Sequence, residues 1–265
     1  MSIDQSAQAV AVVPPSVPVP DRGGTDPCAD LRRLQLVDED GVVDSDGGAW
    51  LRSASREDRQ VLARATGPVL DVGCGPGRHV RALQALGVEV LGIDLSPSVL
   101  ETATRRGAVV RAGSVFDPLP RMGQWQTALL LDGNFGLGGD PLDLLLRLRR
   151  VLRPNGRVLA DLVTGPPMPS RRLRLRHGCH LGPEFPWAPL HLDDLDAVAA
   201  GANFEVVDVW RGERRWFCEL GLATGGSAAP SPDRTAPADR HRSGVPHSPR
   251  AWSRSAVIEG VVRSV

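Results

Sequence analysis

The sequence contains no lysine and no tyrosine, and aromatic residues make up only 4% of it. All 31 of its basic side chains are therefore arginines, and 31 aspartates and glutamates balance them. With a formal net charge of +0, the chain has no excess of positive charge to attract nucleic acid or an anionic membrane. We therefore expect neither as a partner.

Cysteines are few and widely separated. The four are Cys28, Cys74, Cys179 and Cys218, and no two of them form a Cys-x-x-Cys pair. This spacing argues against a disulfide framework and against a zinc site, and it indicates a reducing compartment. We expect no bound metal.

Long hydrophobic runs are also missing. No uncharged apolar stretch reaches the roughly 18 residues that a membrane-spanning helix needs. The segment Met1 to Pro20 carries Asp4 where a signal peptide needs positive charge, and prolines interrupt its apolar residues. The expected location is cytoplasmic.

The length of 265 residues and the hydrophobic content of 42% suit one globular domain with tails. Residues 1–29 are rich in Ala, Val, Pro and Gly without periodicity, which predicts a flexible leader. Residues 222–265 have too few apolar side chains to offset the entropy of ordering, so we expect a disordered or weakly structured tail. The folded domain is predicted over residues 30–221.

Within that domain, short apolar runs alternate with helical patterns. The runs predict strands at 69–72, 88–93, 109–112, 126–131, 157–163, 204–210 and 214–221. Helices are predicted at 78–86, 97–106, 141–152 and 191–201. The expected fold class is α/β, a doubly wound Rossmann-like sheet that is mostly parallel and ends in a C-terminal antiparallel hairpin. Ligands of such sheets bind outside the carboxyl ends of the strands.

A glycine-rich loop follows the first of the parallel strands. It reads Asp71-Val-Gly73-Cys-Gly75-Pro-Gly77, and Asp94 ends the next strand, where a carboxylate can accept hydrogen bonds from ribose hydroxyls. Dinucleotides and S-adenosylmethionine both use this arrangement. The dinucleotide fingerprint requires a third glycine where this chain has Arg78. Asp71 also disfavours a pyrophosphate, whereas the amino and sulfonium groups of S-adenosylmethionine are cationic.

These segments resemble a known family. Residues 69–77, VLDVGCGPG, are similar to the first motif of class I S-adenosylmethionine-dependent methyltransferases, and residues 92–97, GIDLSP, to the second. Residues 152–159, LRPNGRVL, resemble the stretch before the fifth strand of that family. The resemblance spans about residues 50–221 and implies S-adenosyl-L-methionine as cofactor.

The resemblance also implies roles for single residues. The loop from Gly73 to Gly77 contacts the methionine part, Asp94 binds both ribose hydroxyls, and Leu95 lies against adenine. The family acid that binds the adenine amino group is replaced here by Ser114, which Val115 follows, and Asp117 comes three residues after Ser114. Recognition of adenine by Ser114 or by Asp117 is left open. The residues expected to bind the cofactor are Asp71, Gly73, Gly75, Gly77, Asp94, Leu95, Ser114, Val115 and Asp132.

Methyl transfer is an in-line displacement that mainly requires alignment, and a base is needed only for a protonated acceptor. Asp132 and Asn134 follow the fourth strand, where methyl group and acceptor meet. Asp132 is the first candidate base, although its loop could merely cap the next helix. His79 is the second candidate, with a helix-capping or packing role as the alternative.

Residues 164–190 form an insert before the predicted helix at 191–201. Arg172, Arg174 and Arg176 alternate with leucines, which predicts an exposed edge strand with one cationic face, or a contact to an anionic substrate. A Gly/Pro-rich loop that contains His177, His180 and Glu184 is expected to follow as an acceptor lid. Trp50 and Trp187 could line an acceptor pocket or serve as packing anchors.

The predicted function is transfer of a methyl group from S-adenosylmethionine to a small-molecule acceptor, because the domain is neutral and its lid is short. One alternative is a protein or RNA methyltransferase. Another is a non-catalytic S-adenosylmethionine-binding protein, since the family acid is missing at Ser114 and no base is obvious. The acceptor atom and the oligomeric state cannot be read from the chain.

Overall fold

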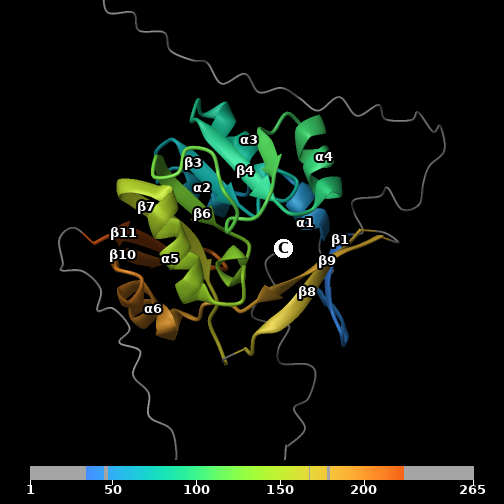
Figure 1. Cartoon of the computed structure of the whole chain (residues 1–265). Helices are drawn as coiled ribbons and strands as arrows, with labels where there is room; N and C mark the ends of the chain where they lie inside the picture. The colour runs from blue at the N-terminus through green and yellow to red at the C-terminus, as the bar shows by residue number, and fades with distance from the viewer. Residues whose placement is uncertain (1–33, 45–46, 167, 178–179, 224–265) are drawn as a thin grey trace, which may run out of the picture.

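The structure is a computed structural model that describes residues 34–44, 47–166, 168–177 and 180–223. The predicted leader at 1–29 and all but the first two residues of the predicted tail lie outside these ranges. Two sheets make up the fold (Figure 1). The larger has seven strands in the order β10-β11-β7-β6-β3-β4-β5, and the smaller has four in the order β2-β1-β8-β9.

The strands of the larger sheet follow the predicted apolar runs closely. They are β3 (Val69–Val72), β4 (Val90–Asp94), β5 (Val110–Ala112), β6 (Trp125–Leu130), β7 (Leu152–Leu162), β10 (Phe204–Arg211) and β11 (Trp216–Leu222). β3 to β7 are parallel to one another, and β10 and β11 form an antiparallel hairpin that pairs with β7 through β11. The doubly wound sheet with a terminal hairpin is thus confirmed.

Helices cover both faces of this sheet. They are α1 (Gly47–Leu51), α2 (Arg56–Leu62), α3 (Arg78–Ala85), α4 (Pro97–Arg105), α5 (Pro141–Val151) and α6 (Leu195–Gly201), with short 3₁₀ turns η2 (Asn134–Gly136) and η3 (Leu192–Asp194). Alternate residues of one strand belong to two different cores, because successive side chains point to opposite faces. Ala128 and Leu130 pack in the core that contains α5 and α6, whereas Leu129 packs in the core that contains α2, α3 and α4.

The connection between α5 and β7 differs from the predicted one. The helix ends at Val151, and β7 begins at the next residue rather than at Arg157. Trp125 pairs with Leu152 and Thr127 with Arg157, so the register shifts between these pairs. Asn155 has a φ of 63°, a left-handed conformation that asparagine tolerates, and so the strand can loop out and resume.

The smaller sheet is the main feature that the sequence reasoning missed. It consists of β1 (Leu34–Asp38), β2 (Gly41–Asp44), β8 (Arg171–His177) and β9 (His180–Trp187). The expected loop at 177–191 is therefore largely a strand, because β9 pairs with β8 from His177↔His180 to Arg171↔Trp187. β8 was predicted at a sheet edge, and this is wrong: it lies between β1 and β9.

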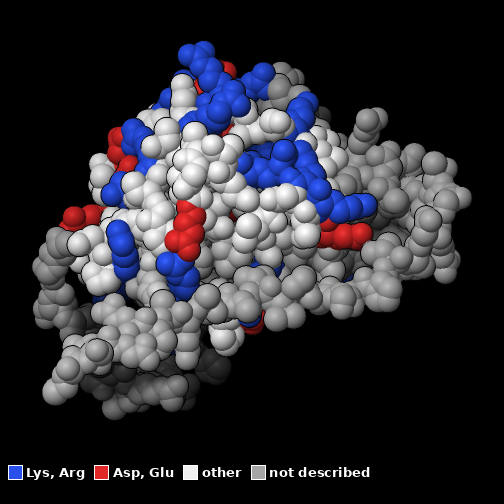
Figure 2. Space-filling model, turned by 90° about the horizontal axis from the view of Figure 1, so that it is seen from above, with Lys and Arg blue, Asp and Glu red and all other residues white. Residues whose placement is uncertain are grey.

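The charges are not spread evenly over the surface. Seen from above, arginine side chains gather over α3 and α4, with few acidic side chains among them (Figure 2). None of the helices in the described ranges is both long and apolar enough to cross a membrane.

Candidate functional site

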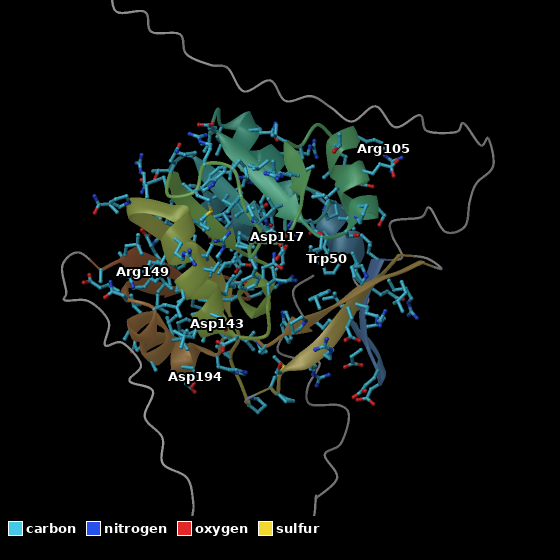
Figure 3. The ribbon with its side chains drawn as sticks, in the orientation of Figure 1. Trp50, Arg105, Asp117, Asp143, Arg149 and Asp194 are labelled. Atoms are coloured by element: carbon cyan, nitrogen blue, oxygen red, sulfur yellow. The ribbon has the colours of Figure 1, made fainter. Side chains whose placement is uncertain are left out.

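A cavity of about 450 Å³ lies outside the carboxyl ends of β3, β4 and β6, where doubly wound sheets bind ligands. One wall comes from the loops that follow these strands, including Gly73, Asp94 and Asp132. The smaller sheet forms the opposite wall, and Leu173 of β8 is one of its lining residues. Trp50 of α1 lies between these walls (Figure 3). The cavity thus joins the glycine-rich loop to the insert.

The glycine-rich loop turns sharply beside the cavity. Gly73 has a φ of 72°, and a Cβ atom there would lie 2.7 Å from the Asn134 side chain. Asn134 Nδ2 donates to the carbonyl oxygens of Val72 and Gly73, both at 2.9 Å, and so fixes the turn. A Cβ at Gly75 would meet nothing within 4 Å, so the loop backbone there is open to a ligand.

Asp94 closes the other side of this loop. Its Oδ2 accepts a hydrogen bond from the Gly75 amide at 2.9 Å, and its Oδ1 accepts one from the Ser96 amide at 2.9 Å. Burial raises the pKa of Asp94, although these backbone hydrogen bonds oppose the rise. Each carboxylate oxygen can accept more than one hydrogen bond, so both remain able to accept from hydroxyls of a ligand.

Asp71 and Gly77 were predicted to bind the cofactor, but neither lines the cavity. Asp71 is only 1% exposed, and its Oδ2 has no hydrogen-bond partner among the described residues. Burial is the main reason that the pKa of Asp71 rises to about 6. A Cβ at Gly77 would lie 2.7 Å from the Ala108 Cβ, so this glycine permits close packing of α3.

Leu95, Ser114 and Val115 line the cavity, as expected of residues beside a nucleoside base. Asp117 is not among the lining residues. Its Oδ2 accepts a hydrogen bond from the Ser114 amide at 3.0 Å, so this carboxylate shapes the loop that carries Ser114. Asp117 is exposed, and its label lies near the centre of the view in Figure 3. Of the two alternatives, only Ser114 lines the cavity.

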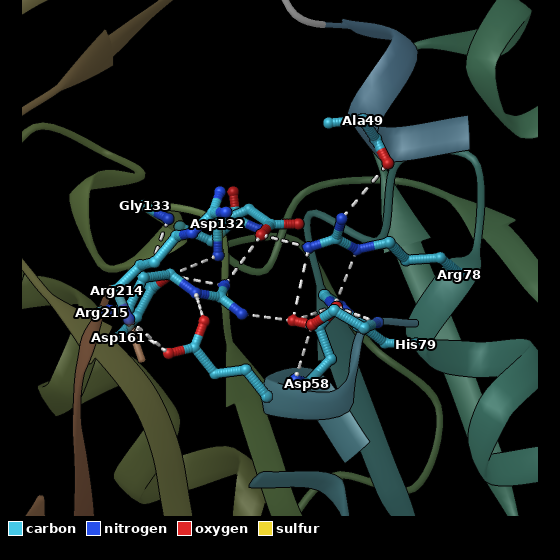
Figure 4. Close-up of polar contacts among 12 residues, drawn as sticks. Ala49, Asp58, Arg78, His79, Asp132, Gly133, Asp161, Arg214 and Arg215 are labelled. Atoms are coloured by element: carbon cyan, nitrogen blue, oxygen red, sulfur yellow. Dashed lines mark hydrogen bonds and ion pairs between the residues drawn. The ribbon is translucent and has the colours of Figure 1, made fainter. Parts of the chain in front are cut away.

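Asp132 lines the cavity at the end of β6, with a φ of 62°. Its Oδ1 accepts from Arg78 Nη2 at 2.6 Å and from Arg215 Nη1 at 3.2 Å (Figure 4). Its Oδ2 has no hydrogen-bond partner within the described ranges. The backbone amides of Asp132 and Gly133 donate to Asp161, at 2.8 and 3.0 Å. This turn is consequently held by three side chains from different elements.

His79 does not reach the cavity. It is 4% exposed, and Arg78 Nε donates to its Nε2 at 3.0 Å. The neighbouring Asp58 carboxylate also contacts Arg78 and Arg215. Burial would raise the pKa of Asp58, but its contacts with His79, Arg78 and Arg215 lower it below the usual range. This position gives His79 a packing role in the charged network and no contact with a molecule in the cavity.

Sequence reasoning missed Asp58, Asp161 and Arg215. Asp58 carries a local signal, because it forms a capping box with Ser55 at the start of α2. Arg215 has no such local signal in the sequence. It lies in the turn of the terminal hairpin, and only the fold brings it to residues that are far away in sequence.

Trp187 both lines the cavity and serves as a packing anchor. Its Nε1 donates to the Gly133 carbonyl at 2.9 Å, and a Cβ at Gly136 would clash with that nitrogen. The lid expected in the insert is therefore a strand fixed to the loop after β6. Glu184 of that strand points to Arg172 and Arg174 on the outer surface, and these arginines lower its pKa.

Residues 69–156 match the family model described as a methyltransferase domain. Among solved structures, a similar chain is an S-adenosylmethionine-dependent methyltransferase from Bacteroides fragilis in complex with S-adenosyl-L-homocysteine. It is 26% identical, with 74% of this chain and 93% of that chain covered and a TM-score of 0.64.

The glycopeptide N-methyltransferase MtfA, complexed with S-adenosylmethionine, is 20% identical. The match covers 65% of this chain and 95% of that one, with a TM-score of 0.50, and supports the fold alone. A comparison with curated protein sequences found no significant match.

Proposed function

Because the chain belongs to the class I S-adenosylmethionine-dependent methyltransferases, we propose that it transfers a methyl group from S-adenosylmethionine to a small-molecule acceptor. The observation that carries this proposal is the single cavity that joins the cofactor loop to the wall formed by the smaller sheet. When bound, S-adenosylmethionine supplies a methyl group activated by its sulfonium.

The residues of the cavity fit this cofactor. The open backbone at Gly75 leaves room for the methionine part, and the buried Asp94 carboxylate suits the ribose hydroxyls. Leu95, Ser114 and Val115 form the expected surface for adenine. The unpartnered Oδ2 of Asp71 supplies negative charge behind the loop, which favours a cationic ligand over a pyrophosphate.

Asp132 is the proposed general base for an acceptor that arrives protonated. Arg78 and Arg215 hold its Oδ1, so the carboxylate has one orientation, and its Oδ2 is left to accept a proton. For an acceptor with a free lone pair, the same residues act only by alignment, which is the larger part of catalysis in an in-line transfer.

The size of the cavity supports a small acceptor. Its volume of about 450 Å³ lies within the range of small-molecule sites, and it must hold cofactor and acceptor together. Hydrogen bonds fix Trp187 and its strand to the loop after β6, so this wall of the cavity is anchored in place. The arginines over α3 and α4 make an RNA test necessary nonetheless.

The test uses methyl-labelled S-adenosylmethionine with three acceptor pools: a small-molecule extract, total protein and tRNA. We expect label only in the pool that passes a small-pore filter, and much less label with the Asp94→Ala variant at limiting cofactor. Label retained on protein or tRNA would overturn the small-molecule acceptor. Cofactor binding without transfer to any pool would identify a binding protein instead of an enzyme.

A further inference from the structure

The smaller sheet presents two chemically different faces. Leu173 and Leu175 of β8 line the cavity, whereas the alternating Arg172 and Arg174 contact Glu184 outside it. Leu36 of β1, which pairs with Leu175, lines the cavity as well. The part of the inner face that lines the cavity is therefore apolar. Arg172, Arg174 and Glu184 lie on the outer face, and the Arg171–Asp38 ion pair lies outside the cavity lining.

Aromatic side chains also line the cavity. Trp187 and Phe185 come from β9, Trp50 comes from α1, and Phe116 comes from the loop after β5. Trp187 has little freedom to move, because its Nε1 is bonded to the Gly133 carbonyl and its ring packs against Gly136. A fixed aromatic surface of this kind favours a flat ring, which gains contact area without ordering the protein further.

The charged side chains of the cavity are on other elements. Four of its lining residues carry charge: Arg78, Asp94, Asp132 and Asp143. Arg78 and Asp132 are paired with each other at 2.6 Å, and Asp94 is bound by two backbone amides. No charged side chain of the smaller sheet lines the cavity within the described part of the chain, so that wall offers nothing to balance a charged acceptor.

We propose that the inner face of the smaller sheet selects the acceptor, and that this acceptor is an uncharged aromatic molecule that binds against Trp187 and the leucines of β8. The inference rests on the proposed methyl transfer, since it names the acceptor class of that same cavity. Leu175 is the specificity-determining residue that we select for mutation, because it lines the cavity and is only partly buried.

The first experiment measures binding to the full chain by calorimetry in saturating S-adenosylhomocysteine. Three probes share one carbon skeleton: naphthol, its anionic relative naphthoate, and the saturated decahydronaphthol. We expect naphthol to bind about 10-fold or more tightly than either of the others. Equal or tighter binding of naphthoate would refute an uncharged site, and equal binding of decahydronaphthol would refute an aromatic one.

The second experiment places the probe. Leu175→Ser should weaken naphthol binding by about 10- to 100-fold, because a buried apolar contact is lost. Arg174→Ser is the matched control, since it changes the neighbouring residue on the outer face, and it should leave naphthol binding unchanged. Unchanged naphthol binding by Leu175→Ser, or equal weakening of S-adenosylhomocysteine and naphthol, would overturn the assignment of this wall to the acceptor.

Binding of S-adenosylhomocysteine and binding of naphthol test the proposed function and the acceptor class separately. If S-adenosylhomocysteine does not bind the wild-type chain, the proposed function is wrong. If it binds and naphthol does not, only the acceptor class is wrong. The probe series needs only the wild-type chain, so it decides the chemistry of the cavity even where a variant does not fold.

Discussion

Arg215 is the cation that four carboxylates share. Its Nε lies 3.2 Å from Glu57, its Nη1 lies 3.2 Å from Asp132 and 3.4 Å from Asp161, and its Nη2 also contacts Asp58. The side chain is only 15% exposed, and Asp58 is 1% exposed. Burial would lower the pKa of Arg215, but the surrounding carboxylates raise it above the usual value.

We expect Arg215→Met to destabilise the protein severely. Removing one partner from a buried ion pair leaves an uncompensated charge and costs about 3–5 kcal/mol. Asp161 loses its one ion-pair partner among the described residues, so this range applies to its contact with Arg215, whereas Asp58 and Asp132 keep Arg78 as a partner. At about 2–4 °C per kcal/mol for a domain of this size, the midpoint of thermal unfolding should fall by ~6–20 °C.

The assays are urea unfolding for the free energy and heating for the midpoint, both followed by the fluorescence of six tryptophans. Arg172→Met is the control: its side chain is 69% exposed, so loss of its pair with Glu184 should cost at most about 1 kcal/mol. Adding Asp58→Asn to Arg215→Met should restore part of the loss, because it removes one of the four carboxylates that Arg215 balances. A cost of Arg215→Met no larger than that of Arg172→Met would refute the buried network.

Three further predictions concern the site. Gly75→Val should abolish binding of S-adenosylhomocysteine in calorimetry, because its φ of 51° and the close approach of a ligand both exclude a branched side chain; retained affinity would place the cofactor elsewhere. Burial raises the pKa of Asp71 from 3.8 to about 6, so its contribution to stability is complete below pH 3.8 and is lost as the pH rises through about 6. The unfolding free energy of the ligand-free chain should therefore fall by up to ~3 kcal/mol in this window, and Asp71→Asn should flatten that fall; an unchanged pH profile would show that Asp71 is not desolvated. Asp132→Asn should lower methyl transfer to a protonated acceptor by about 10²–10⁴-fold while folding and S-adenosylhomocysteine binding persist, and full activity would remove Asp132 from the chemistry.

The larger sheet could be predicted because its signals are local. Three of the four residues of Val69–Val72 are apolar, as expected for a strand buried on both faces, and Pro97 opens α4 where the sequence places its start. Asp94 ends one such strand, and the glycines of the loop come directly after another, which is where such sheets bind ligands. The cofactor side of the cavity could therefore be predicted before the fold was known.

The smaller sheet could not be predicted in the same way. β1 is short, and its partner in β8 lies far along the chain, as the pairing of Leu36 with Leu175 shows. β9 contains Gly182, Pro183 and Pro186, which normally indicate a loop, and only its pairing with β8 makes it a strand. Arg215 presents the same difficulty, because its contacts are set by the tertiary fold alone.

The proposed methyl transfer depends most directly on where the cofactor binds. Calorimetric titration with S-adenosylhomocysteine should show saturable binding to the wild-type chain. Asp94→Ala should weaken that binding by about 1.5–3 kcal/mol, because charge-assisted hydrogen bonds are lost. Asp208→Ala, a change on β10 outside the cavity lining, should leave it unchanged. Equal affinities of wild type and Asp94→Ala, or displacement of the ligand by NAD, would contradict the account.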